Sequence, residues 1–226
     1  LALSSLLSPY SYRIYSPING FSGKTSSTSA ALRLSAEFWL APQWAIGVAG
    51  EYAGFQMNDQ GFDRTTFELT GKYRIRLNSN EYGWTFSPKL GAEVRNYNFI
   101  YPSSFFVSNP SLNDSKVTAL GAAVGLDIRK QFSKHFSIGA KIGYFYPVAL
   151  LEGAGSGSKI EGAPSTRNLS AGIQGLYWLS RVWGLGVGGY FEMRSLSFRP
   201  SGAAENEETY MDGSYFFGSV IFRMWK

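Results

Sequence analysis

Charged side chains recur at every second position of otherwise apolar segments, and the chemistry they offer is ion pairing. The clearest segment runs from Thr65 to Leu77. One face carries Glu68, Thr70, Lys72, Arg74 and Arg76, and the other carries Phe67, Leu69, Tyr73, Ile75 and Leu77. A repeat of two residues is typical of a β-strand with two unlike faces, and no helical phase separates these residues as well. The segment is predicted to be a strand.

The same alternation puts charged groups on one face of successive strands. If such strands close into a narrow barrel, the charged faces line a lumen with room for side chains but little for water. An unpaired charge there is very costly, so we expect salt bridges that fix the strand register and plug the barrel. An excess of basic groups leaves open a narrow path that prefers anions. The predicted network comprises Arg33, Glu37, Glu51, Glu68, Lys72, Arg74, Arg76, Lys89, Glu93, Arg95, Asp127, Arg129, Lys141, Glu192, Arg194 and Arg223.

Few residues suit catalysis or metal binding. The single histidine, His135, stands in a short turn segment with no acidic residue near it in the sequence to support a role as general base. The chain has no cysteine and no histidine cluster, so neither a metal site nor a cofactor is expected. Glu205, Glu207 and Glu208 form an acidic cluster that a solvated loop explains best. We therefore expect a protein that is not an enzyme.

Composition narrows the class of protein further. The formal net charge is +5, but the basic residues are spread singly along the 226 residues, whereas a nucleic-acid-binding face would gather them into patches. Aromatic residues make up 16% of the chain and glycine contributes 26 residues, as expected of twisted barrel strands. No apolar run approaches the roughly 20 residues of a transmembrane helix. The opening residues 1–7 are predicted to be a strand or an ordered arm, although they also resemble part of a signal peptide.

The alternating segments predict a single domain, residues 1–226, folded as a transmembrane antiparallel up-and-down β-barrel. We expect about ten strands, with eight as the alternative, because single-chain bacterial barrels have even strand numbers. Connections near 41–43, 78–83, 131–135 and 180–183 are short, whereas those at 17–27, 57–64, 100–115, 151–165 and 199–209 are longer. This sorting predicts short periplasmic turns, long extracellular loops and both termini in the periplasm.

Three features favour a membrane barrel over a soluble one. A strand of about 13 residues tilted by about 40° rises about 33 Å, enough to cross an outer membrane. Small residues such as Gly121, Gly125 and Gly172 share the charged face, where they would relieve crowding in a lumen. Aromatic residues gather near the short turns, where they are predicted to form an interfacial girdle. Its tryptophans are Trp39, Trp44, Trp84, Trp178, Trp183 and Trp225.

The long loops are the surface on which function is expected. One of them is unusually apolar for an exposed loop, and such patches usually contact a partner or a lipid, or fold over the barrel mouth. Both possibilities stay open. Its candidate contact residues are Ile100, Tyr101, Phe105, Phe106 and Val107.

The chain resembles the small outer-membrane barrels of Gram-negative bacteria, with an architecture of the OmpA, OmpX and OmpW type, over nearly its full length. The resemblance rests on the alternating strands, the sorted loops and the final segment Tyr215–Trp225, which is similar to the family's C-terminal assembly signal. That signal usually ends in an aromatic residue, whereas Lys226 follows here. The resemblance implies membrane insertion by the barrel-assembly machinery. Motifs of the omptin, palmitoyltransferase and deacylase families are not recognisable.

The function expected is that of a non-enzymatic outer-membrane protein with a plugged lumen, acting as a structural, adhesion or partner-binding module through its loops. Its expected contacts are outer-membrane lipid, lipopolysaccharide and a protein partner, and not nucleic acid. The alternative is a small channel or transporter for anionic or apolar solutes. An outer-membrane enzyme that modifies lipids or cleaves proteins is a distant third.

Overall fold

The computed structural model describes residues 2–16, 21–57, 60–77, 82–100, 114–152, 159–160, 168–199 and 207–223. Within these ranges every regular element is a β-strand, and no helix is long and apolar enough to cross a membrane. The strands are β1 (Ala2–Ser16), β2 (Phe21–Trp39), β3 (Trp44–Met57), β4 (Gln60–Tyr73), β5 (Ile75–Arg76), β6 (Trp84–Ile100), β7 (Asp114–Gln131), β8 (Phe136–Glu152), β9 (Lys159–Ile160), β10 (Leu169–Trp178), β11 (Trp183–Arg199) and β12 (Glu207–Phe222).

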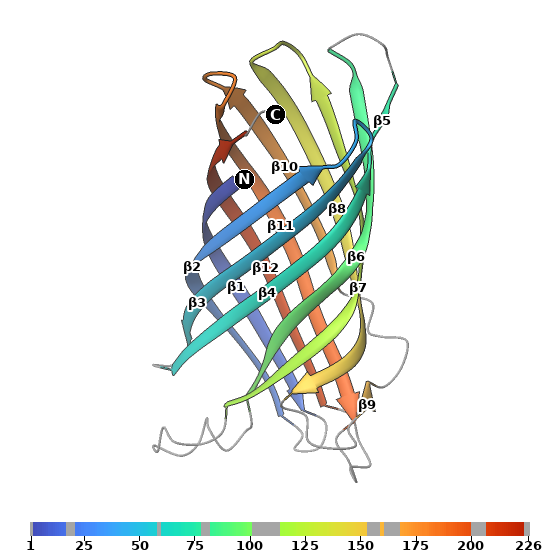
Figure 1. Ribbon diagram of the computed structural model, residues 1–226. Helices are drawn as coiled ribbons and strands as arrows, with labels where there is room; N and C mark the ends of the chain where they lie inside the picture. Colours follow the sequence, from blue (N-terminus) through green and yellow to red (C-terminus); the bar gives the residue numbers. More distant parts are fainter. Residues whose placement is uncertain are drawn as a thin grey trace.

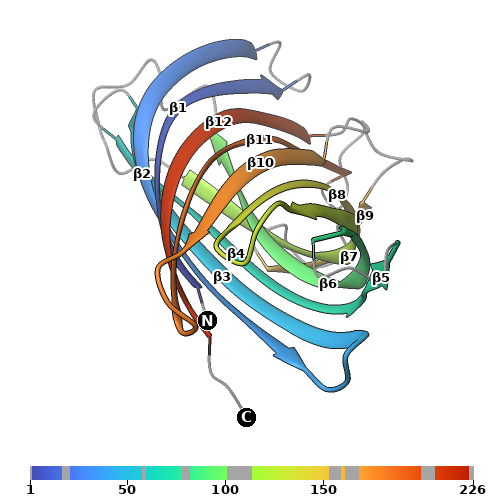
Figure 2. The same cartoon turned by 90° about the horizontal axis from the view of Figure 1, so that it is seen from above.

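The strands form one closed antiparallel sheet (Figures 1 and 2). Each long strand pairs with its neighbours in sequence, β10 pairs with both β8 and β11, and β1 pairs with β12 to close the ring. β4 and β5 hold one register against β6 and act as one strand interrupted at Arg74, while β9 adds a short pairing to β11. Among the described residues the ring therefore has ten strands. This confirms the all-β up-and-down barrel and favours ten strands over eight.

The connections divide between the two ends of the barrel (Figure 1). The short-turn end carries the connections 40–43, 77–83, 132–135 and 179–182, and it is also where β1 begins and β12 ends, since Ala2 pairs with Ile221. The long-loop end carries the connections 17–20, 58–59, 101–113, 153–168 and 200–206. The predicted sorting holds in part, because only 101–113 and 153–168 are longer than every connection at the short-turn end. Both ends of the ring of strands lie with the short turns.

Two of the predicted long connections are mostly strand, which corrects the sequence-based boundaries. β2 begins at Phe21, so it includes most of the expected loop 17–27. β3 and β4 pair as far as Met57 with Gln60, so the expected loop 57–64 shrinks to two residues. The sequence of 21–27 and of 60–64 does not alternate between polar and apolar residues, so a search for alternating polarity cannot detect strands of that kind.

The faces of the sheet are inverted relative to a soluble barrel. Large apolar side chains point outward: Leu90 is 65% exposed and Phe216 is 73% exposed. Charged side chains point inward, and Glu93 and Glu192 are almost completely buried. Since apolar surface of this extent is favourable only in contact with lipid, the outer face is built for a membrane.

Glycine makes room inside the barrel at its most crowded points. Gly121 lies on β7 where the pairing with β8 shifts register, and a Cβ at this position would overlap the Tyr146 carbonyl oxygen and the Phe145 ring. Gly125 faces the Lys89 side chain, which would overlap a Cβ in the same way. These residues allow the lumen to hold long charged and aromatic side chains.

Candidate functional site

A buried ionic cluster crosses the lumen in the half of the barrel nearer the long loops. Arg64 on β4 is only 1% exposed and donates from Nη1 to Oε2 of Glu192 on β11, at 3.2 Å. Its Nη2 donates to Glu51 on the neighbouring strand β3. One guanidinium therefore links carboxylates from opposite parts of the sheet, as expected where buried charges must pair.

Two further arginines complete this cluster around Glu192. Arg194 Nε lies 3.0 Å from Glu192 Oε2, and Arg95 Nη1 lies 3.6 Å from Glu192 Oε1. Arg95 also pairs with Glu93 on its own strand, and Arg194 donates to Thr66 Oγ1 at 2.8 Å. Glu192 is thus the shared acceptor on which three guanidinium groups converge.

The ion pairs continue from this cluster toward the short-turn end. Arg33 bridges Glu51 and Glu68 at 3.3 and 3.2 Å, and Lys89 Nζ donates to Glu68 at 2.8 Å. These side chains come from β2, β3, β4 and β6. The arrangement ties four consecutive strands of the ring together through their inward faces.

A separate group lies closer to the short turns. Lys72 Nζ donates to Glu37 at 2.6 Å and to Asp127 at 2.9 Å. Lys141 behaves differently: among the described residues it forms no ion pair, and its Nζ lies 4.6 Å from the ring centroid of Tyr190. Cation–π attraction therefore replaces a carboxylate partner at this predicted lumen position.

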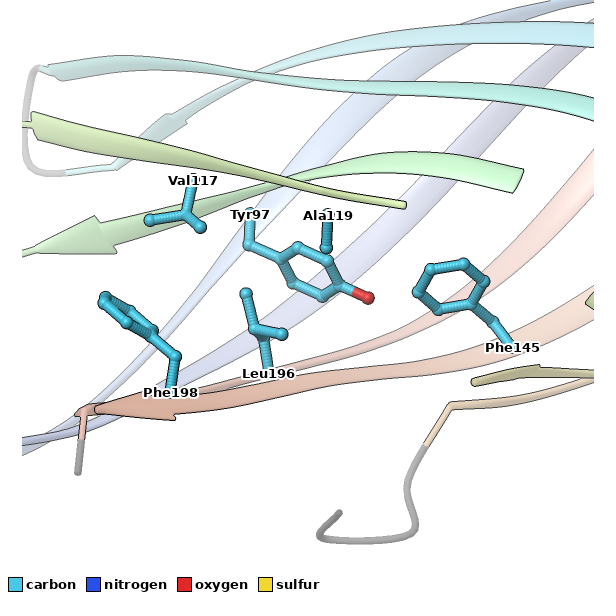
Figure 3. Packing of buried hydrophobic residues seen from close by; sticks show 6 residues of the cluster. All are labelled: Tyr97, Val117, Ala119, Phe145, Leu196 and Phe198. Carbon is cyan, nitrogen blue, oxygen red and sulfur yellow. The ribbon is translucent and has the colours of Figure 1, made fainter. Parts of the chain in front are cut away.

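An apolar cluster lies inside the barrel (Figure 3). Its side chains come from β6, β7, β8 and β11 and point toward one another, and all are at most 3% exposed. Tyr97 follows Arg95 on β6 and Leu196 follows Arg194 on β11, each by two residues, so both continue the inward face. The cluster consists of Tyr97, Val117, Ala119, Phe145, Leu196 and Phe198.

Asn168 closes the sheet where β10 is too short to do so. Its carbonyl oxygen accepts from Phe145 N at 3.0 Å, and its side-chain amide pairs with both the N–H and the carbonyl of Ser195, at 3.0 and 2.8 Å. The Tyr97 hydroxyl donates to the same side chain at 3.3 Å. The amide thus satisfies buried backbone groups that would otherwise lack a partner near the edges of β8 and β11.

Four residues of the predicted network lie at its short-turn end. These are Arg74, Arg76, Arg129 and Arg223, and the last three are exposed. The first three form no ion pair with any described residue. For these three the prediction of a buried salt-bridged plug is wrong, because they lie at the last inward positions of their strands, where the lumen opens to solvent.

The tryptophans divide into two groups instead of forming one girdle. Trp44, Trp84 and Trp183 lie on the outward face and are 45–56% exposed, at the level expected of an interfacial belt. Trp39 pairs with buried Ala45, which pairs with Lys72, so it lies on the lumen face. Trp178 covers Gly184 on that same face. Placing Trp39 and Trp178 in the girdle was an error, since proximity to a turn does not fix which face a side chain takes.

The remaining predicted positions contribute little to a site. Ile100 is the last residue of β6, whereas Tyr101, Phe105, Phe106, Val107 and Trp225 lie outside the described residues. The Nδ1 of His135 lies 2.9 Å from the Trp178 carbonyl oxygen, and the ring stacks on Tyr177. No group of three or more acidic or histidine side chains in the described ranges is arranged to hold a metal ion.

Sequence reasoning missed Arg64, Asn168 and the apolar cluster. Arg64 shares the parity of Thr66 and Glu68, so extending the alternation of β4 by two residues would have found it. Tyr97, Leu196 and Phe198 each lie an even number of residues after an inward arginine of their strand. An apolar residue on a charged face does not by itself indicate a buried cluster. Asn168 precedes β10 and has no periodic signature.

No family model matches the sequence, and no curated protein shows significant similarity to it. Among solved structures, the outer-membrane protease OmpT from Escherichia coli is similar with a TM-score of 0.51 and 12% identity, covering 98% of this chain and 96% of that one. The transport unit of the autotransporter AIDA-I from Escherichia coli gives a TM-score of 0.47 and 11% identity, with 99% and 90% covered. At 12% identity the likeness to OmpT concerns the fold alone, that of a transmembrane antiparallel β-barrel, and the apolar outer face of this chain agrees with that fold.

Proposed function

We propose that this chain is a non-enzymatic integral protein of the bacterial outer membrane, with a closed lumen and with function carried by its long loops. Both termini would then face the periplasm, with the short turns. The observation that carries the proposal is the filling of the lumen at two successive levels, by the Arg64–Glu51–Glu192 ion pairs and by the apolar cluster around Tyr97 and Leu196. A lumen filled in this way supports a scaffold more than a pore.

The described residues also support the non-enzymatic part of the proposal. The inward carboxylates are engaged by arginine or lysine, and the lumen around them is filled. His135 contacts a backbone carbonyl and a tyrosine ring, with no acidic side chain beside it. A general base needs access to substrate and a suitable partner, and these groups lack one or both.

A small channel or transporter is the second candidate function. The observation that favours it is the set of arginines at the short-turn mouth, which would attract anions. A conducting path would require the apolar cluster and the ionic cluster to move apart. The scaffold proposal needs no such movement.

Deleting residues 101–113 separates the two candidates. If the loops bind a protein partner or lipopolysaccharide, the deletion abolishes capture of that partner from native outer membranes and leaves solute flux at background. If the chain is a transporter, the deletion changes flux. A matched deletion within 201–206 controls for general loss of loop surface, and heat-modifiable mobility on denaturing gels verifies that each barrel is folded.

A further inference from the structure

Four arginines share the lumen face at the short-turn end of the barrel. Arg76 on β5 pairs with Thr85, which pairs with Arg129 on β7. Paired residues on adjacent strands lie on the same face, and Arg129 continues the inward face that Asp127 begins. Arg74 follows Lys72, and Arg223 follows Ser219, at even spacings on their own inward faces.

Two of these arginines are stacked on tryptophan. The guanidinium carbon of Arg74 lies 3.3 Å from the ring centroid of Trp39, and that of Arg223 lies 4.0 Å from the ring of Trp178. Stacking uses the flat face of the guanidinium, so its in-plane N–H donors stay directed away from the ring. The two tryptophans therefore hold the arginines in fixed planes at the mouth.

The charges at this mouth repel one another. The guanidinium of Arg74 is repelled electrostatically by those of Arg76, Arg129 and Arg223. Burial and the neighbouring Arg129 lower the pKa of Arg223, which follows the end of β12. The nearest inward carboxylates, Glu37 and Asp127, are already bound to Lys72. Within the described part of the chain Arg74, Arg76 and Arg129 form no ion pair, so these three give the mouth a surplus of positive charge.

Side chains occupy the lumen beyond the mouth. The Lys72 group, the ion pairs of Arg33 and Glu68, and the apolar cluster follow one another along the lumen toward the long loops. An anion that enters from the short-turn end meets the arginines and then a filled interior. A site of this shape retains an anion instead of passing it on.

We propose that Arg74, Arg76, Arg129 and Arg223 form a binding site for a phosphate group presented from the short-turn side. A phosphate dianion or diphosphate offers several acceptor oxygens to bidentate guanidinium groups and carries more than one negative charge. A carboxylate brings one charge, which offsets less of the repulsion among four cations. The phosphate could belong to a free solute or to a phosphomonoester lipid headgroup, which also carries more than one negative charge, and the chemistry of recognition is the same.

The site can be tested by titrating pyrophosphate into the protein held in phosphatidylcholine nanodiscs and measuring heat at low salt. We expect saturable binding that weakens as salt is raised, because exposed charges are screened. The double variant Arg74→Gln with Arg129→Gln should bind about tenfold more weakly or worse, as expected when charged hydrogen bonds are lost. Arg76→Gln with Arg129→Gln removes two exposed side chains and serves if the first variant does not fold.

The matched control combines Lys130→Gln with Arg181→Gln, which removes the same two charges from other places. Lys130→Gln lies on the outward face beside Trp84, and Arg181→Gln lies in the turn between β10 and β11, so neither should change pyrophosphate affinity. Nanodiscs with phosphatidic acid are compared with phosphatidylglycerol nanodiscs of equal surface charge: weaker pyrophosphate binding with phosphatidic acid identifies the lipid headgroup as the source, and equal binding identifies a free solute. Absence of saturable binding, or an equal loss in the control variant, would overturn the proposal.

Discussion

Arg64 on β4 donates a hydrogen bond to Glu192 on β11, a residue 128 positions later in the sequence. The two strands are not neighbours in the ring, so this ion pair spans the lumen and holds opposite walls together. Because its second nitrogen group binds Glu51, the same guanidinium also ties β3 to this contact. Ion pairs across the lumen therefore help to stabilise the barrel.

Replacing Arg64 with leucine should lower the free energy of unfolding by about 1.5–3 kcal/mol, because Glu51 and Glu192 each lose a charged hydrogen bond while keeping other arginine partners. Lys116→Gln is the matched control, since it breaks the half-exposed pair with Asp63 and should cost about 0–1 kcal/mol. Unfolding by urea in lipid vesicles, followed by tryptophan fluorescence, measures both. Equal costs for the two variants would contradict the inward placement of Arg64.

The two groups of tryptophan should differ in their access to lipid. Lipids brominated near the headgroup should quench the fluorescence of Trp44, Trp84 and Trp183, which face outward, and leave Trp39 and Trp178 largely unquenched. Trp44→Phe should therefore reduce the quenchable fraction of the emission, whereas Trp39→Phe should increase it. The opposite pattern would show that Trp39 faces lipid and belongs to the interfacial girdle.

The alternation of side chains predicted the strand class, the even strand number and the inward face of Glu51 or Lys89. It did so because lipid outside and packed charge inside impose opposite demands on successive residues. It failed where those demands stop. The sequence of 21–27 and of 60–64 does not alternate between polar and apolar residues, so the alternation predicts a loop at Arg64. Trp39 pairs with Ala45 and shares the parity of Glu37, so it lies on the lumen face. Being an aromatic residue near a turn does not indicate which face it takes.

Glycine packing gives a prediction with opposite signs at two positions. Gly121→Ala should destabilise the barrel by about 1–3 kcal/mol, because the new Cβ overlaps the Tyr146 carbonyl and the Phe145 ring. Gly50→Ala meets no atom within 4 Å and should stabilise by about 0.5 kcal/mol, since alanine has less backbone freedom to lose in a strand. Urea unfolding in vesicles measures both, and a neutral Gly121→Ala would show that β7 and β8 pack less tightly at this register shift.

Removing part of the apolar cluster should weaken the closure of the lumen without changing the outer face. Phe145→Ala combined with Leu196→Ala leaves a gap beside the ionic cluster, and we expect brief ion-conducting openings in planar bilayers. The outward pair Phe216→Ala and Leu90→Ala is the control, because it removes the same two kinds of side chain from the lipid-facing surface. Openings in the control and not in the cluster variant would mean that the plug lies elsewhere.

The central claim, a lumen closed by its own side chains, is tested most directly by the conductance of the unmodified protein in a planar bilayer. If the lumen is closed, the current stays at the baseline of the protein-free membrane at either polarity, with protein insertion verified independently. Steady, ion-selective single-channel openings of the unmodified protein would contradict it.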